Sequence, residues 1–158
     1  MSVETSQPRS WLGLVVFLLI VMGVGSVIGF ASAPDAWYAG LAKAPWNPPN
    51  WVFAPAWFAL YVMIAIAGWR SFSADPSSGQ TIAWILQMIL NWAWSPTWFT
   101  LHLTWPAFVL IIAILALVLA FIVISWRRGD KVSAWLFVPY AAWVGFASTL
   151  NLAIAVLN

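Results

Sequence analysis

Long apolar stretches alternate with short polar connections along almost the whole chain. Five stretches are about 20 residues long, which is the length that crosses a bilayer as an α-helix. The fourth of them has no polar side chain between residues 107 and 124, so we expect it to be the most lipid-exposed. The pattern predicts an all-α integral membrane protein, a five-transmembrane-helix bundle. The predicted helices cover approximately residues 11–31, 51–69, 80–100, 106–126 and 132–157.

Composition supports a membrane protein that forms a single domain. Of 158 residues, 64% are hydrophobic and only 6% are charged, too few polar side chains to cover a water-soluble globule. No change of composition divides the chain, so we predict one membrane domain over residues 1–158, with bilayer lipid as a partner. The absence of cysteine excludes disulfide and thiolate chemistry. A net charge of +2 from so few charges does not indicate a nucleic-acid surface.

The first apolar stretch also has features of a signal peptide. Arg9 precedes it, and Ala31-Ser32-Ala33 has the small-x-small pattern of a cleavage site. The stretch is longer than the roughly 7–15 residues of a signal core, however, and Pro34 should hinder cleavage. We therefore interpret this stretch as a membrane helix.

The distribution of basic residues predicts the orientation. Lysine and arginine in short loops favour the cytoplasmic side of a membrane. One side of a five-span bundle would hold five basic residues, and the other side only Lys43. We expect a bacterial cell membrane, with the N-terminus in the cytoplasm and the 32–50 connection outside. The five basic residues are Arg9, Arg70, Arg127, Arg128 and Lys131.

The only long connection, residues 32–50, is predicted to fold over the bundle as a lid. Its prolines restrict the backbone and its aromatic side chains supply apolar area. An interfacial aromatic belt is the alternative, and we favour it for tryptophans at the ends of the spans. The lid residues behind this prediction are Pro34, Trp37, Tyr38, Pro45, Trp46, Pro48 and Pro49.

Polar and aromatic side chains recur at intervals of four, which places them on single helix faces. Two readings remain open, interhelical hydrogen bonding and a cavity. The neighbouring tryptophans favour an aromatic cavity beneath the lid, suited to a flat, conjugated, hydrophobic ligand. The residues concerned are Trp57 and Tyr61, then Gln87, Asn91 and Ser95, and finally Trp135, Pro139, Trp143, Ala147 and Asn151.

Catalytic and metal-binding patterns are scarce. The acidic residues all fall outside the predicted spans, and they form no carboxylate pair, triad or metal cluster. The single histidine, His102, is interpreted as an exposed turn residue, with axial ligation of haem as the alternative. Gly25-x-x-x-Gly29 is interpreted as close packing inside the bundle, with a dimer contact as the alternative.

Four motifs, taken in order, resemble those of a known family. They cover most of the chain from Trp37 onward: Trp37-Tyr38 with KAPWNPP from Lys43 to Pro49, Trp57 with Tyr61, QxxxNxxWSPxxF from Gln87 to Phe99, and VPYxxW from Val138 to Trp143. The chain resembles the tryptophan-rich sensory protein and translocator protein family, TspO/MBR, whose mitochondrial members were named peripheral benzodiazepine receptors.

The resemblance implies a five-helix bundle, usually a homodimer, that binds porphyrins such as protoporphyrin IX or haem below the first loop. It implies no required cofactor and no metal site. Some members bind sterols, but here no tyrosine followed by a basic residue stands between Leu150 and Asn158, so sterol binding at that end is doubtful. Carried over position by position, the ligand-contacting residues are Tyr38, Trp46, Trp57, Asn91, Trp94, Ser95, Trp143 and Ala147.

The leading hypothesis is a membrane-embedded binding protein for porphyrins that acts in sensing, regulation or translocation. The resemblance also includes members that promote light- and oxygen-dependent porphyrin breakdown, for which Trp57 and Trp143 are the candidate catalytic residues. The chain has no acid–base pair, so we favour a protein that is not an enzyme. A transporter of small hydrophobic ligands is the third hypothesis, which the lack of ionisable residues in the spans disfavours.

Overall fold

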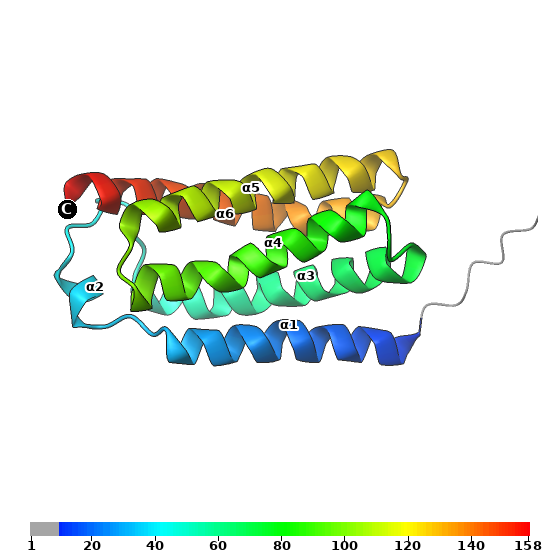
Figure 1. Ribbon diagram of the computed structural model, residues 1–158, viewed down its shortest axis with the longest axis horizontal. Coiled ribbons are helices and arrows are strands. Elements are labelled where there is room, and N and C mark those ends of the chain that lie inside the picture. The colour runs from blue at the N-terminus through cyan, green and yellow to red at the C-terminus, as the bar shows by residue number, and fades with distance from the viewer. Residues whose placement is uncertain (1–9) are drawn as a thin grey trace, which may run out of the picture.

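A computed structural model describes residues 10–158 as a bundle of long helices that run side by side (Figure 1). No β-strand occurs in this range, and the predicted all-α membrane fold is confirmed. Arg9, one of the basic residues used for the orientation, lies outside the described residues. The elements are α1 (Trp11–Ala31), α2 (Ala36–Gly40), η1 (Asn50–Val52), α3 (Phe53–Ala74), α4 (Gly79–Ser95), η2 (Pro96–Thr100), α5 (Thr104–Arg127) and α6 (Lys131–Leu157).

The predicted third span is divided between two elements. Four described segments are long and apolar enough to cross a membrane, namely α1, η1 with α3, α5 and α6. α4 ends at Ser95 and continues directly into η2, a single π-helical turn. Pro96 has no N–H to donate one turn back, and the wider turn closes where the Leu101 N–H donates to the Pro96 carbonyl at 2.9 Å. We therefore count α4 and η2 together as one crossing, the third along the chain, which brings the total among the described residues to five.

Other helix boundaries differ from the sequence prediction. α3 continues to Ala74, beyond the predicted end at residue 69, because Arg70 pairs with Asp130 at 2.6 Å and does not terminate the helix. α5 and α6 begin before the predicted ranges 106–126 and 132–157. The 32–50 connection contains the short helix α2.

The most exposed long helix is α1, which contradicts the prediction for the segment 106–126. Only 11% of the apolar window of α1 is buried, against 28% of the window of α5. α1 lies along one side of the bundle and contacts mainly α3, whereas α5 packs against both α4 and α6 (Figure 1). An apolar sequence permits a helix to face lipid but does not determine how many neighbours cover it.

Two glycines allow aromatic rings to approach a helix backbone. At Gly68 of α3, an added Cβ would lie 2.6 Å from Nε1 of Trp84, whose N–H donates to the Ile64 carbonyl at 2.9 Å. At Gly25 of α1, an added Cβ would overlap the ring of Tyr61. Gly25 is therefore a packing position inside the bundle.

Asp130 joins three spans at the end of the bundle opposite the lid. Its carboxylate caps α6 by accepting the Ser133 N–H at 3.3 Å, and it also accepts hydrogen bonds from Arg70 at 2.6 Å and from Gln80 at 3.1 Å. Burial would raise the pKa of the Asp130 carboxyl, but hydrogen bonds from Ser133, Arg70 and Gln80 outweigh it and hold the pKa below its ordinary value. The ionised side chain therefore fixes α3 and α4 against the start of α6.

Candidate ligand-binding site

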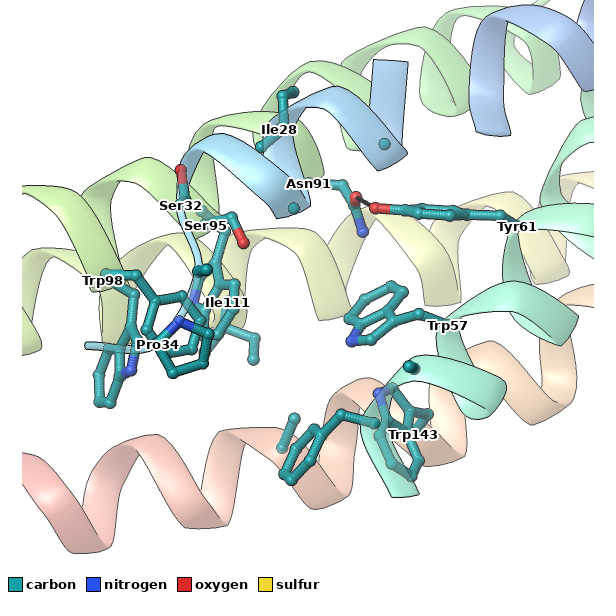
Figure 2. A pocket seen from close by; sticks show the side chains of 18 of the residues that line it. Ile28, Ser32, Pro34, Trp57, Tyr61, Asn91, Ser95, Trp98, Ile111 and Trp143 are labelled. Carbon is teal, nitrogen blue, oxygen red and sulfur yellow. Dashed lines mark hydrogen bonds between the residues drawn. The ribbon is translucent and has the colours of Figure 1, made fainter. Parts of the chain in front are cut away.

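A cavity of about 580 Å³ lies at the lid end of the bundle. Its walls come from α1, α2, η1, α3, α4, η2, α5 and α6, and from the segment between α1 and α2. Figure 2 shows Trp57 and Trp143 on one side, Trp98 and Pro34 on the opposite side, and Asn91 above Trp57, bonded to Tyr61. The volume falls within the range of about 300–1,000 Å³ that is typical of small-molecule sites.

Aromatic rings form much of the cavity wall. Trp94 and Trp98 stack with their ring centroids 5.8 Å apart and their planes 13° apart. Across the cavity, Trp143 of α6 meets Phe53 of α3 edge-on, with centroids 5.9 Å apart. Such walls complement a flat, conjugated molecule better than an ion, since few polar atoms face the interior.

A chain of hydrogen bonds extends from the cavity into the bundle. The Tyr61 hydroxyl donates to Oδ1 of Asn91 at 3.1 Å, and Nδ2 of Asn91 donates to the Tyr140 hydroxyl at 2.8 Å. The Tyr140 hydroxyl donates in turn to Oε1 of Gln87 at 2.9 Å. Only Tyr61 and Asn91 line the cavity, whereas Gln87 is fully buried and its Nε2 has no partner among residues 10–158. Of the polar side chains on this face of α4, Gln87 therefore forms a hydrogen bond between helices, and Asn91 also lines the cavity.

A second polar contact holds the tryptophan pair. The Trp94 indole N–H donates to Oδ1 of Asn151 at 3.1 Å, and Nδ2 of Asn151 donates to the Ala147 carbonyl at 3.2 Å. The indole nitrogen of Trp143 is buried and has no hydrogen-bond partner in the described part of the chain. The small side chain of Ala147, on the same helix, lines the cavity beside it.

The lid is tied to the C-terminal end of α6. The Asn158 side chain accepts the Ala42 N–H at 2.9 Å and donates to the Ala42 carbonyl at 3.0 Å. Within the lid, the Lys43 ammonium donates to the Tyr38 carbonyl at 2.6 Å. These contacts hold the lid over the end of the bundle.

The single histidine also contacts the lid. Its ring stacks on Trp37 with centroids 4.1 Å apart, and its Nε2 lies 3.2 Å from Oδ2 of Asp35. The backbone N–H of Tyr38 and the neighbouring His102 hold the pKa of the Asp35 carboxyl below its ordinary value, although burial opposes them. His102 has a φ of 57°, in the left-handed region. His102 is exposed, as predicted, and its contacts with Trp37 and Asp35 also help to attach the lid to the bundle.

The structure brings together nearly all of the residues taken from the family resemblance. The exception is Trp46, which does not line the cavity. Its side chain is 57% exposed, and its indole N–H donates to the Thr149 hydroxyl at 3.4 Å. Ligand contact at the other positions remains a prediction. The cavity-lining members are Tyr38, Trp57, Asn91, Trp94, Ser95, Trp143 and Ala147.

Sequence reasoning missed the part of the wall that α1 supplies. Ser26 and Gly29 line the cavity, but their apolar stretch gave no reason to separate them from a lipid-facing helix. It also missed Phe99 in the turn that follows α4, whereas Trp98 in the same turn is one of the tryptophans that favoured a cavity. Tyr61, which the four-residue interval placed on the same helix face as Trp57, does line the cavity.

Comparison with known sequences decides the family. The sequence profile of the TspO/MBR family matches residues 15–157. The chain belongs to the TspO/MBR family. It is 31% identical to the tryptophan-rich protein TspO of Chlorobaculum tepidum, over 91% of this chain and 97% of that protein. It is 30% identical to protein CrtK of Rhodobacter capsulatus, over 93% and 94% of the two chains, and 32% identical to the translocator protein of Sus scrofa, over 89% and 87%.

Membership of the TspO/MBR family makes this chain an integral multi-pass membrane protein of the sensory and translocator class. The matching relatives include proteins named tryptophan-rich sensory protein and translocator protein, which is consistent with a protein that is not an enzyme. Among residues 10–158, no three His, Asp or Glu side chains lie close enough together to hold a metal ion. What this TspO/MBR protein offers a ligand is therefore an aromatic cavity with a few hydrogen-bonding groups.

Proposed function

We propose that the protein binds a tetrapyrrole, protoporphyrin IX or haem, in the lid-end cavity and acts in sensing, regulating or translocating it. The observation that supports this proposal is a cavity of about 580 Å³ with tryptophans on opposite walls. A planar ring system would bury both of its faces against indoles, while its polar substituents would reach the few polar atoms available. Ser95 lines the cavity with a hydroxyl group, and the buried indole N–H of Trp143 has no partner among residues 10–158.

The direct test fills the cavity from α6. Ala147→Phe places a ring in the cavity, whereas Ala142→Phe places the same ring on an exposed face of the same helix. Protoporphyrin IX is titrated into each purified protein in detergent, and binding is followed by the shift of the porphyrin absorbance band. Wild type and Ala142→Phe should bind saturably, and Ala147→Phe should bind at least about tenfold more weakly, a loss of about 1.4 kcal/mol. Equal affinity in all three proteins would contradict the proposed site.

Porphyrin breakdown is the second candidate function. Trp57 lies against two oxidisable side chains, with centroid distances of 5.3 Å to Tyr61 and 6.3 Å to Tyr140. Irradiation of the complex in air, with a dark sample as control, should bleach the porphyrin if the protein promotes its oxidation. Faster bleaching with wild type than with Trp57→Phe, at equal occupancy, would support this function over binding alone.

The proposed orientation places the lid outside the cytoplasm. The described basic residues at the opposite end are Arg70, Arg127, Arg128 and Lys131, whereas the lid holds only Lys43. Because the chain has no native cysteine, Ala39→Cys and Ser77→Cys would each carry a single thiol. In intact cells, an impermeant maleimide should label Ala39→Cys and not Ser77→Cys, and the opposite labelling would reverse the orientation.

A homodimer is the proposed assembly, which the family resemblance supports. Light scattering of the purified protein, corrected for bound detergent, would distinguish a dimer from a monomer of 17.5 kDa.

A further inference from the structure

The opening of the cavity lies on one side of the bundle. Many residues that line the cavity are buried or half-buried, including all of those from α4, η2, α5 and α6. Every lining residue that is exposed comes from α1, α3, η1 or the segment after α1. The cavity therefore opens between α1 and α3. The exposed lining residues are Ser26, Gly29, Phe30, Ala33, Pro34, Asn50, Ala54 and Phe58.

Two glycine positions on α1 show where this helix separates from α3. At Gly25 the Tyr61 ring of α3 occupies the space of a Cβ, so the two helices are in close contact there. One turn later, at Gly29, no atom of residues 10–158 lies within 4 Å of an added Cβ, although Gly29 lines the cavity. α1 and α3 therefore touch at Gly25 and leave a gap from Gly29 toward the lid.

The opening lies at the depth of the bilayer hydrocarbon. At about 1.5 Å per residue, the 21 residues of α1 span about 31 Å, close to the thickness of a hydrocarbon core of about 30 Å. Ser26 is five residues from the end of α1, and Phe58 is five residues from the start of α3, so each lies about 8 Å below the lid end. The opening is flanked by two exposed phenylalanines: Phe30 is 88% exposed and Phe58 is 63% exposed.

The lid, by contrast, is attached where the bundle faces water. Asn158 holds the Ala42 backbone by two hydrogen bonds, and His102 stacks on Trp37 and contacts the Asp35 carboxylate at 3.2 Å. Passage through the lid would have to break these contacts, whereas passage between α1 and α3 would not.

We propose that the ligand enters and leaves sideways, between α1 and α3, from the leaflet at the lid end. This inference rests on the proposed function and adds the route and the ligand class, an amphiphilic planar molecule that first partitions into the membrane. The small side chains along the gap, Ser26 and Gly29 on one helix and Ala54 on the other, leave room for such a molecule. Phe30 and Phe58 present rings to it at the edge.

The experiment narrows the gap from each side separately. Gly29→Phe and Ala54→Phe add a ring at the opening. Their matched controls are Gly23→Phe, where no described residue lies within 4 Å of an added Cβ, and Ala59→Phe. Both control positions are exposed, and neither lines the cavity. The proteins are reconstituted in liposomes and mixed with vesicles that carry protoporphyrin IX, and stopped-flow quenching of tryptophan fluorescence gives the association and dissociation rates.

The expected result separates the route from the site. Gly29→Phe and Ala54→Phe should slow association and should also slow dissociation, each by at least about tenfold, which corresponds to about 1.4 kcal/mol on the barrier. The control variants should match wild type. Asn158→Ala, which releases the lid at Ala42, should also match wild type.

Three results would overturn the lateral route while the proposed function stands. The first is saturable binding with wild-type rates in both gap variants. The second is faster association in Asn158→Ala, which would indicate entry through the lid. The third is weaker equilibrium binding at an unchanged association rate, which would place the added rings in the site. Absence of saturable binding to wild type would remove the proposed function, and the route with it.

Discussion

Removing the Tyr140 hydroxyl should destabilise the bundle more than removing the Gln87 amide to which it donates. The hydroxyl accepts from Asn91 at 2.8 Å and donates to Gln87 at 2.9 Å, so Tyr140→Phe removes two interhelical hydrogen bonds. Each such bond in a membrane protein contributes about 0.6 kcal/mol on average and up to about 1.7 kcal/mol. The expected cost of Tyr140→Phe is therefore about 1–3 kcal/mol.

Gln87→Leu should cost less, for a reason specific to this site. It removes one hydrogen bond, but it also removes Nε2, a buried donor without a partner in the described residues. Losing an unsatisfied buried group offsets part of the lost bond, so we expect about 0–1 kcal/mol. In the double variant with Tyr140→Phe, both ends of the 2.9 Å bond are gone, and the total cost should fall short of the sum by about 0.5–1.5 kcal/mol.

The free energy of unfolding is measured for wild type, the two single variants and the double variant. Each is unfolded in mixed micelles with increasing sodium dodecyl sulfate, and its helix content is followed by circular dichroism. Ile89→Ala, on an exposed position of α4, serves as a control because its effect should add to that of Tyr140→Phe. Strict additivity of Tyr140→Phe and Gln87→Leu would refute the coupling, as would a larger cost for Gln87→Leu than for Tyr140→Phe.

Three further predictions concern stability and the lid. Because the native pKa of Asp130 is lowered, its contribution to stability is present above its ordinary pKa of 3.8 and is lost as pH falls through the native value. Unfolding measured from about pH 3 to 7 should therefore show a larger loss of stability in wild type than in Asp130→Asn. Gly68→Ala should cost about 1–3 kcal/mol because the new methyl group overlaps the Trp84 ring, whereas Gly145→Ala, with open space at its Cβ, should cost little in the same unfolding assay. His102→Ala should increase hydrogen exchange of the lid amides without lowering the stability of the bundle, and unchanged lid exchange would show that the histidine does not hold the lid.

The sequence by itself determined the membrane fold and the approximate helical spans, and seven of the eight positions taken from the family motifs line the cavity. These features depend on local properties: the length of an apolar stretch, the residue that caps it and the interval between side chains on one face. α1 begins at Trp11 and ends at Ala31, as predicted, because Ser10 caps its first turn and a prolyl segment follows. The four-residue intervals of α4 likewise place Asn91 and Ser95 on the cavity.

Only the tertiary structure decided which helices meet. It paired Asn91 with Tyr140, joined Arg70 to Asp130, and left α1 apart from α3 beyond Gly25. The physical reason is that lipid tails are as apolar as the side chains they surround, so hydrophobicity does not select one neighbour over another. Hydrogen bonds between helices and the fit of rings against glycine make that selection, and both depend on residues far apart in the chain.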